Sequence, residues 1–294
     1  MSTTKISVLT NVIVNSGVKN LRDVAELAAS LGFSGLEVGP TLPLDEHAFE
    51  EVLTNGIVDI SALIYCRNYL STDAEEANFH IQELKKRILF ASKFDIPVIV
   101  TSTGIDKSIE EGVYDKADSI RKIPARSLNE FERVFTPIVD LAENHGVKIA
   151  FENCPLMGNI AISPAMWELI FERIKSDNIG LAYDPSHLVW QHIDPYLYIL
   201  DFSDKIFHFH AKDTQIDRKK LGKYGFLTDF SWWKYRIVGD GEIDWTRLRD
   251  LLKQARYNGA ISIEHEDSRY EGSFELVNEG LKKGLEFLKK TFAD

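Results

Sequence analysis

Two patterns of hydrophobic and polar positions alternate along this chain. Short apolar runs rich in Val, Ile and Phe are typical of strands that are buried on both faces. Longer stretches between them carry apolar residues at helical spacing. The predicted strands span residues 5–10, 34–38, 58–64, 97–101, 147–152, 179–183, 205–210 and 260–264. This alternation predicts a parallel sheet whose strands are joined by helical crossovers.

Capping residues mark the starts of several predicted helices. Asn20 and Asp244 each precede a stretch with helical spacing, and Pro164 suits the first turn of another helix. Ser127 and Glu130 form a capping-box pattern before a helix that reaches about residue 144. The helices therefore fall between the predicted strands, as crossovers require.

The number of strands points to a barrel. Eight strand–helix units in 294 residues fit an α/β fold of the (β/α)8 TIM-barrel type, with residues 1–294 as a single domain. The rival is a doubly wound open sheet. Against it, no predicted strand is followed by G-x-G-x-x-G, and Gly239-Asp240-Gly241 is a bare G-x-G after a loop.

Four predicted strands end in residues that bind hard metal ions, namely Glu152, Asp184, His210 and Glu264. Barrel active sites form at the C-terminal ends of the strands, which lie about 4.8 Å apart, so these side chains can converge. Three carboxylates buried together are costly unless a cation compensates them. Three oxygens and one nitrogen suit one divalent metal ion, Mn²⁺ first, with Mg²⁺, Co²⁺ or Zn²⁺ as alternatives.

Other candidate residues lie near the same strand ends. His208 and His210 share one face of their strand, so we expect one as a ligand and the other as its neighbour. His187 is placed either to contact substrate or to hold a loop. Glu37 can bind a substrate hydroxyl, cap a helix or form a salt bridge. Lys212 can meet a substrate phosphate or carboxylate, or remain solvated.

An aromatic insertion of about residues 213–240 follows the seventh strand. Its aromatic residues are Tyr224, Phe226, Phe230, Trp232, Trp233 and Tyr235. A loop this aromatic is unsuited to water, so we expect a lid over the barrel mouth that also touches another subunit. Trp233 and Arg236 are predicted substrate contacts, with Arg236 directed to an anionic group.

Composition narrows the class of partner. A formal net charge of −11 argues against a nucleic-acid partner. Two cysteines are too few for a disulfide framework, and no apolar run approaches the roughly 18 residues of a membrane span. We expect a cytoplasmic protein with a small-molecule sugar or polyol substrate, no membrane partner and a possible homo-oligomeric state.

Four motifs resemble the xylose-isomerase-like superfamily of sugar isomerases and epimerases, particularly the ketose 3-epimerases and the sugar phosphate isomerases/epimerases. They are Phe151-Glu152-Asn153-Cys154-Pro155, Asp184-Pro185-Ser186-His187, His208-Phe209-His210-Ala211-Lys212-Asp213-Thr214 and Ile263-Glu264-His265-Glu266-Asp267. In strand order and length, the resemblance covers essentially the whole chain.

The resemblance implies a role for each matching residue. Glu152 and Glu264 are implied as metal ligands that also transfer protons, and Asp184 as a ligand only. His210, rather than His208, is implied as the nitrogen ligand, and His187 as a hydrogen-bonding partner of substrate hydroxyls. The chain departs from the 3-epimerases at Ile216, where they carry an arginine that meets substrate. The sugar is therefore not specified.

We therefore expect a divalent-metal-dependent sugar or sugar phosphate isomerase/epimerase that transfers protons through a metal-stabilised enediolate. The alternative is a dehydratase or lyase that acts on a keto-polyol or 3-keto sugar at the same metal site. A non-catalytic sugar-binding barrel is disfavoured because binding alone does not need a buried acidic cluster. An endonuclease IV-like DNA repair enzyme needs more metal ligands and a basic face, and the charge of −11 disfavours it.

Overall fold

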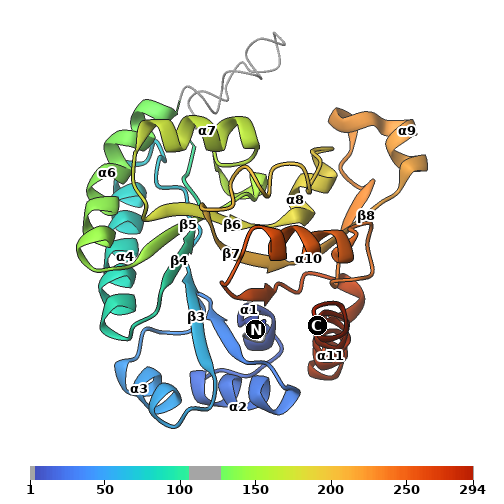
Figure 1. The fold of residues 1–294 in the computed structure, drawn as a ribbon, viewed down its shortest axis with the longest axis horizontal. Coiled ribbons are helices and arrows are strands. Elements are labelled where there is room, and N and C mark those ends of the chain that lie inside the picture. The colour runs from blue at the N-terminus through green and yellow to red at the C-terminus, as the bar shows by residue number, and fades with distance from the viewer. Residues whose placement is uncertain (1–3, 106–126, 294) are drawn as a thin grey trace. The chain divides into compact units, whose positions relative to one another are not determined.

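The structure is a computed structural model, and it describes residues 4–105 and 127–293. In this part of the chain, eight parallel strands form a closed barrel in the order β1-β10-β7-β6-β5-β4-β3-β2 (Figure 1). The barrel strands are β1 (Ile6–Leu9), β2 (Gly35–Val38), β3 (Asp59–Ile64), β4 (Val98–Thr101), β5 (Lys148–Glu152), β6 (Ile179–Tyr183), β7 (Ile206–Ala211) and β10 (Ile261–Ile263). Each lies within a predicted strand or extends it by one residue, which confirms the predicted fold class.

Helices follow most of the strands. They are α1 (Asn11–Asn15), α2 (Leu21–Leu31), α3 (Glu46–Thr54), α4 (Ala74–Lys93), α6 (Leu128–Asn144), α7 (Pro164–Arg173), α8 (Pro185–Trp190), α9 (Arg218–Thr228), α10 (Trp245–Gln254) and α11 (Phe274–Thr291). Two 3-10 turns span Pro155–Met157 and Ser268–Tyr270. None of the described helices combines the length and the hydropathy that crossing a membrane demands.

Two of the predicted caps are confirmed and one is wrong. The side chain of Asn20 accepts a hydrogen bond from the Asp23 N–H at 2.9 Å, and that of Asp244 accepts from the Arg247 N–H at 3.0 Å. Ser127 makes no side-chain capping bond. Its backbone is helical, with φ −76° and ψ −6°, whereas a capping hydroxyl needs the extended conformation to turn back onto the first turn.

Contacts within the chain define two compact units, and each is described by itself. Unit 1 contains Met1–Ser61, Asp184–Ser203 and Phe209–Asp294, and unit 2 contains Ala62–Tyr183 and Asp204–His208. The prediction of a single domain over residues 1–294 stays a prediction.

Unit 2 is held together by an aromatic cluster between α6 and β5. Phe131 and Phe135 of α6 stack with ring centroids 4.9 Å apart. Both meet Phe151 of β5 edge-on, at 5.7 and 5.3 Å. All three rings are fully buried, so the strand that ends at Glu152 rests on a rigid apolar support.

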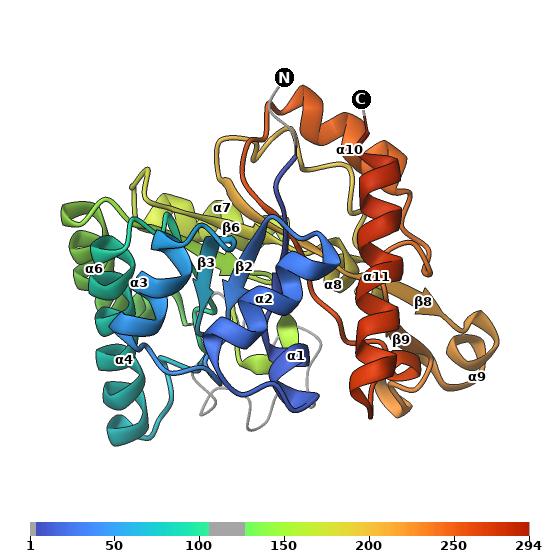
Figure 2. The same ribbon diagram turned by 90° about the horizontal axis from the view of Figure 1, so that it is seen from below.

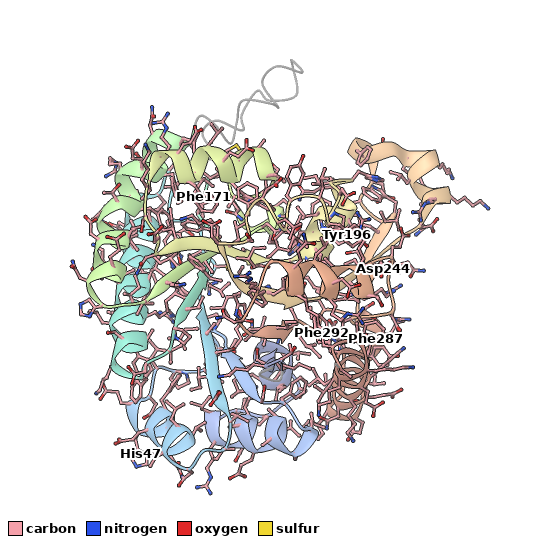
Figure 3. All side chains as sticks on the ribbon, viewed as in Figure 1. His47, Phe171, Tyr196, Asp244, Phe287 and Phe292 are labelled. Atoms are coloured by element: carbon pink, nitrogen blue, oxygen red, sulfur yellow. The ribbon has the colours of Figure 1, made fainter. Side chains whose placement is uncertain are left out.

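In unit 1, β1 pairs with both β2 and β10, so the first and last barrel strands lie side by side. Helix α11 follows the last strand, and Figure 2 shows it beside α1. Tyr196 lies next to the start of α10 (Figure 3), where its hydroxyl accepts a hydrogen bond from the Asp244 N–H at 2.7 Å. The Arg247 guanidinium lies 4.1 Å from the Tyr196 ring centroid, and this contact fixes the first turn of α10.

The insertion folds as an antiparallel hairpin. Its strands β8 (Asp213–Ile216) and β9 (Trp233–Arg236) flank α9, and Figures 1 and 2 both show the three elements together. Trp232 is fully buried with Trp190 and Ile216. The Asp213 carboxylate ties the hairpin to the following segment, because it accepts hydrogen bonds from Trp245 Nε1 and from three backbone N–H groups.

Candidate functional site

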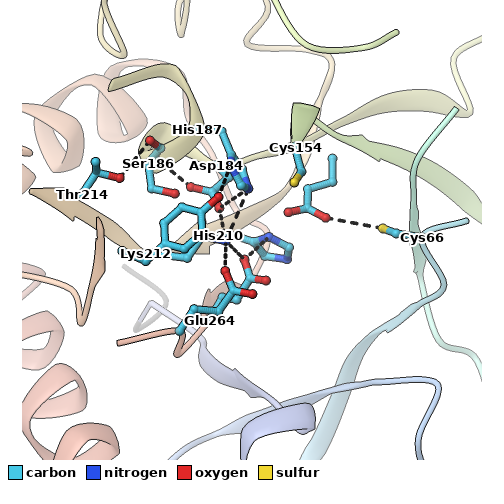
Figure 4. A network of polar contacts seen from close by, with 12 residues as sticks. Cys66, Cys154, Asp184, Ser186, His187, His210, Lys212, Thr214 and Glu264 are labelled. Atoms are coloured by element: carbon cyan, nitrogen blue, oxygen red, sulfur yellow. Dashed lines mark hydrogen bonds and ion pairs between the residues drawn. The ribbon is translucent and has the colours of Figure 1, made fainter. Parts of the chain in front are cut away.

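Three ligand-bearing side chains of unit 1 converge where their strands end. Asp184 directly follows β6 and caps α8, accepting a hydrogen bond from the Ser186 N–H at 2.8 Å. Glu264 directly follows β10, and His187 lies in the first turn of α8. One ligand atom of each of Asp184, His187 and Glu264 lies within 4.8 Å of those of the other two (Figure 4). This spacing is compatible with one shared cation.

His210 of β7 is oriented by a carboxylate. Its Nε2 lies 3.0 and 3.1 Å from the two carboxylate oxygens of Glu37, and both side chains are fully buried. Its Nδ1 lies 3.3 Å from Glu264 Oε2. A carboxylate on one ring nitrogen fixes the proton there and leaves the other nitrogen with a lone pair for a metal ion. The Nδ1 of His210 is therefore the candidate nitrogen ligand, and Glu37 holds the ring, while its predicted contact with substrate stays a prediction.

Lys212 is buried among the same carboxylates. Its Nζ lies 2.7 Å from Glu264 Oε2, 2.9 Å from Glu266 Oε2 and 3.2 Å from Asp184 Oδ2. Burial lowers the pKa of Lys212, but Asp184, Glu264 and Glu266 outweigh it and raise this pKa well above its ordinary value. The ammonium is therefore charged, and its predicted contact with a substrate anion stays a prediction.

The donor set fits a divalent cation. The buried carboxylates of Glu37, Asp184 and Glu264 outnumber the single buried ammonium of Lys212 in this part of unit 1. A buried excess of negative charge is costly unless a cation compensates it. Carboxylate oxygens from Asp184 and Glu264 with the imidazole Nδ1 of His210 are ligands that Mn²⁺ and Zn²⁺ accept.

Glu152 belongs to unit 2, at the end of β5. Its oxygen Oε2 accepts a hydrogen bond from the Cys66 thiol at 3.4 Å (Figure 4). Asn159 donates a hydrogen bond to its backbone carbonyl at 2.6 Å. In the β5–β6 ladder, Glu152 is opposite Ala182, two residues before Asp184. Glu152 and Asp184 thus end neighbouring strands. His208 is buried in β7, two residues before His210.

Two predicted substrate contacts of the insertion are engaged with protein groups. Trp233 stacks on Trp190 at 4.7 Å, with the rings 4° from parallel. Arg236 is mostly buried, donates to Gln215 Oε1 at 2.9 Å and lies 3.3 Å from Asp267 Oδ1. Both side chains hold the hairpin in place, and their contact with substrate stays a prediction.

Sequence reasoning missed two residues of this cluster. Glu266 follows Glu264 by two positions and binds Lys212. This spacing could have predicted Glu266 as a residue of the site. Tyr235 contacts both His187 and Lys212. Its position depends on the register of the β8–β9 hairpin, which no local pattern specifies.

A cavity of about 460 Å³ opens beside Glu264 within unit 1. Polar side chains line much of it, including Asn11 and Asn15 of α1, Ser16 directly after α1, and Glu266 and Glu271 after β10. Its lining contains no lysine or arginine among the described residues. Such a cavity suits a compact ligand with many hydroxyl groups.

Comparisons with known proteins agree with this fold. An inosose dehydratase of Clostridium beijerinckii is 26% identical over 257 residues, which cover 83% of this chain and 80% of that protein. An inosose dehydratase of Salmonella agona is 26% identical over 271 residues, covering 89% and 87%.

Solved structures share the fold. The IOLI protein with a binding zinc atom has a TM-score of 0.72 at 20% identity, covering 99% of this chain and 100% of that one. A D-tagatose 3-epimerase-like protein has a TM-score of 0.70 at 23% identity, with the same coverage. The Xylose isomerase-like TIM barrel family matches residues 25–291, and this chain therefore belongs to that family.

Proposed function

We propose that this protein is a divalent-metal-dependent dehydratase that acts on an uncharged, polyhydroxylated cyclic ketone of the inosose type. The observation that carries the proposal is that Glu264, beside a polar cavity, lies close both to Asp184 and to the Nδ1 of His210. The curated relatives named inosose dehydratase support the choice of reaction. The carboxylates in the cavity wall favour an uncharged substrate, because they would repel a phosphate.

Asp184, His210 and Glu264 would hold the cation, with Glu152 as the fourth ligand. Glu152 is included because it ends the strand next to β6, which leads into Asp184. A bound divalent cation supplies Lewis-acid polarisation of the substrate carbonyl. Manganese remains our first choice of metal, with zinc as the alternative.

Glu264 is the proposed base, because it both lines the cavity and belongs to the ligand cluster. It takes the proton from the carbon next to the carbonyl. The electron pair of that C–H bond forms a C=C bond as the C–O bond at the next carbon breaks. The departing hydroxide receives the proton, so water is lost and no oxidant or reductant is consumed.

Epimerisation is the second candidate, and a second glutamate favours it. Glu152 ends β5, which two strands separate from β10 in the barrel order. A carboxylate there can return the proton to the opposite face of the same intermediate. The two reactions differ in product, because dehydration gives an unsaturated ketone and epimerisation gives a stereoisomer.

The test is incubation of the Mn²⁺-loaded protein in D₂O with inososes, ketoses and 3-keto glycosides. Absorbance of a conjugated ketone identifies dehydration, and deuterium in recovered sugar identifies epimerisation. Chelation by EDTA should stop either reaction. The proposal is contradicted if no substrate of the panel gives either signal.

Glu264→Gln and Glu152→Gln should each lower kcat at least a thousandfold while the fold is retained, because the amide is neither a base nor an anionic ligand. Glu26→Gln, on the exposed face of α2, is the matched control and should keep full activity. Near-normal turnover in either active-site variant would remove that glutamate from the chemistry.

A further inference from the structure

The insertion hairpin carries one side chain to the candidate site. In the β8–β9 ladder, Tyr235 is directly opposite Thr214, so both side chains lie on the same face of the hairpin. The Thr214 hydroxyl donates a hydrogen bond to the Ser186 carbonyl at 2.9 Å. Ser186 precedes His187 in α8, so this bond fixes the hairpin face against the turn that presents His187.

Tyr235 contacts the imidazole of His187 directly. Its hydroxyl oxygen lies 3.0 Å from Nδ1, and the two rings are nearly perpendicular with centroids 5.5 Å apart. On the other side of the imidazole, Nε2 lies 3.3 Å from Lys212 Nζ in hydrogen-bond geometry, and 3.4 Å from Asp184 Oδ2. An ammonium group can only donate, so Nε2 of a neutral His187 accepts from Lys212. The ring proton then sits on Nδ1 and is donated to the Tyr235 hydroxyl.

The same tyrosine covers Lys212. The Lys212 Nζ lies 4.4 Å from the centroid of the Tyr235 ring, which is within the range of a cation–π contact. Trp233 meets the Tyr235 ring edge-on at 4.7 Å and itself stacks on Trp190. The Tyr235 ring therefore has a rigid aromatic support, and its two polar contacts are fixed together.

We infer that Tyr235 is a positioning residue, which sets the tautomer and orientation of His187 with its hydroxyl and holds Lys212 with its ring. This role rests on the proposed function and on the expectation from the sequence that His187 binds a substrate hydroxyl. With its proton on Nδ1, His187 presents Nε2 and its lone pair on the side of Lys212 and Asp184. The insertion thus positions two basic side chains of the site, His187 and Lys212, through Tyr235.

Nuclear magnetic resonance of the histidine ring nitrogens tests the inference without reference to turnover. The Zn²⁺-loaded protein avoids the paramagnetism of Mn²⁺, and His187→Gln assigns the signal. Wild-type protein should show His187 as a single tautomer with its proton on Nδ1. In Tyr235→Phe, which keeps the ring, the two nitrogen shifts should move toward averaged values. Unchanged His187 shifts in Tyr235→Phe would overturn the inference.

Tyr224→Phe is the matched control, because Tyr224 lies in α9 of the same insertion and contacts Lys223 rather than the site. It should leave the His187 shifts and the kinetics unchanged. Equal changes in both variants would mean that the insertion responds as a whole and would also overturn the inference.

Kinetics give the second readout. Tyr235→Phe should lower kcat/KM for the ketone substrate about 10- to 100-fold, with metal affinity and Tm unchanged. Tyr235→Leu should lower it further, because the ring over Lys212 is lost. An unchanged kcat/KM in Tyr235→Phe would overturn the positioning role. If the wild-type protein turns over no ketone, the proposed function fails, and the His187 spectrum still decides whether Tyr235 sets the tautomer.

Discussion

At the residue scale, the pairing of Glu37 with His210 is the best-defined part of the candidate site. Both side chains are excluded from solvent, and Glu37 places both of its oxygens on one ring nitrogen. The carboxylate therefore fixes which ring nitrogen carries the proton and makes the other nitrogen more electron-rich. The role of Glu37 was left open by the sequence because its partner is 173 residues away.

Glu37→Gln should weaken metal binding about 10- to 100-fold, because the amide no longer withdraws the imidazole proton from the far side. Isothermal titration calorimetry with Mn²⁺ or Zn²⁺ measures the change. Glu26→Gln removes an exposed carboxylate of α2 and should bind metal as the wild type does. Equal affinities for the two variants would show that the Glu37–His210 bond does not act on the metal site.

The contribution of Asp267 to the stability of the fold depends on pH. Burial raises the pKa of Asp267, but hydrogen bonds from the Arg269 guanidinium and from the Ile237 and Arg269 N–H groups lower it to about 2. The folded-state pKa thus lies below the unfolded value of roughly 3.9. The stability it contributes is present above about pH 4 and is lost as the pH falls toward 2.

Asp267→Asn should therefore lower the free energy of unfolding by about 1–2 kcal/mol at pH 7. Urea unfolding at pH 7, 5 and 3.5 measures it. The difference from wild type should be constant between pH 7 and 5 and smaller at pH 3.5. A difference that grows on acidification would contradict the assigned pKa.

At the element scale, α11 packs tightly against the segment after β10 because it carries glycine. A Cβ atom at Gly280 would lie 2.5 Å from His265 Nε2 and 2.8 Å from Tyr270 Cβ. His265 is buried, and its neighbours in the sequence are Glu264 and Glu266. A displacement of the His265 ring should therefore also shift these two residues of the candidate site. The helix approach thus helps to fix the end of β10.

Gly280→Ala should destabilise the protein by about 1–3 kcal/mol through this overlap, although alanine is the better helix former. Gly222→Ala in α9 is the matched control, because a Cβ there meets no atom within 4 Å. It should be neutral or stabilise by about 0.5–1 kcal/mol. Thermal and urea unfolding of both variants measure the contrast, and stabilisation of Gly280→Ala would contradict the close packing.

Periodicity located the barrel strands but not the hairpin. Buried parallel strands such as β5 and β6 are continuous apolar runs, which local sequence reveals. The hairpin instead joins Asp213–Ile216 to Trp233–Arg236 across α9, where Gly225 adopts a non-helical φ of 67°. Its pairing depends on Trp232 and Trp190 meeting in the fold, and no local pattern encodes that contact.

At the scale of the whole molecule, strand order explains why the positions of the candidate ligands could be predicted. A barrel brings the C-terminal ends of all its strands to one end, so the places of Asp184, His210 and Glu264 followed from the pattern, while their role as metal ligands stays a prediction. Lys212 was predicted as a contact of a substrate anion, which stays a prediction, and its partners within the protein were not predicted. Its contacts depend on side-chain packing, which the pattern of strands does not contain.

Metal binding should stabilise the whole fold, because a ligand that binds only the folded state adds its binding free energy. Mn²⁺ at a hundred times its Kd should add about 2.7 kcal/mol, a rise in Tm of about 5 °C. Circular dichroism melts with Mn²⁺ and with EDTA measure the shift, and Asp184→Asn should reduce it. No rise in Tm with Mn²⁺, Mg²⁺, Co²⁺ or Zn²⁺ would contradict the metal site.

The bond between Glu37 and His210 has a consequence for how the chain matures. A ribosome makes the glutamate 173 residues before its histidine. Until the histidine emerges, a carboxylate that the folded protein buries has no imidazole beside it. We therefore expect the second strand to stay hydrated during synthesis until the strand that carries His210 has been made.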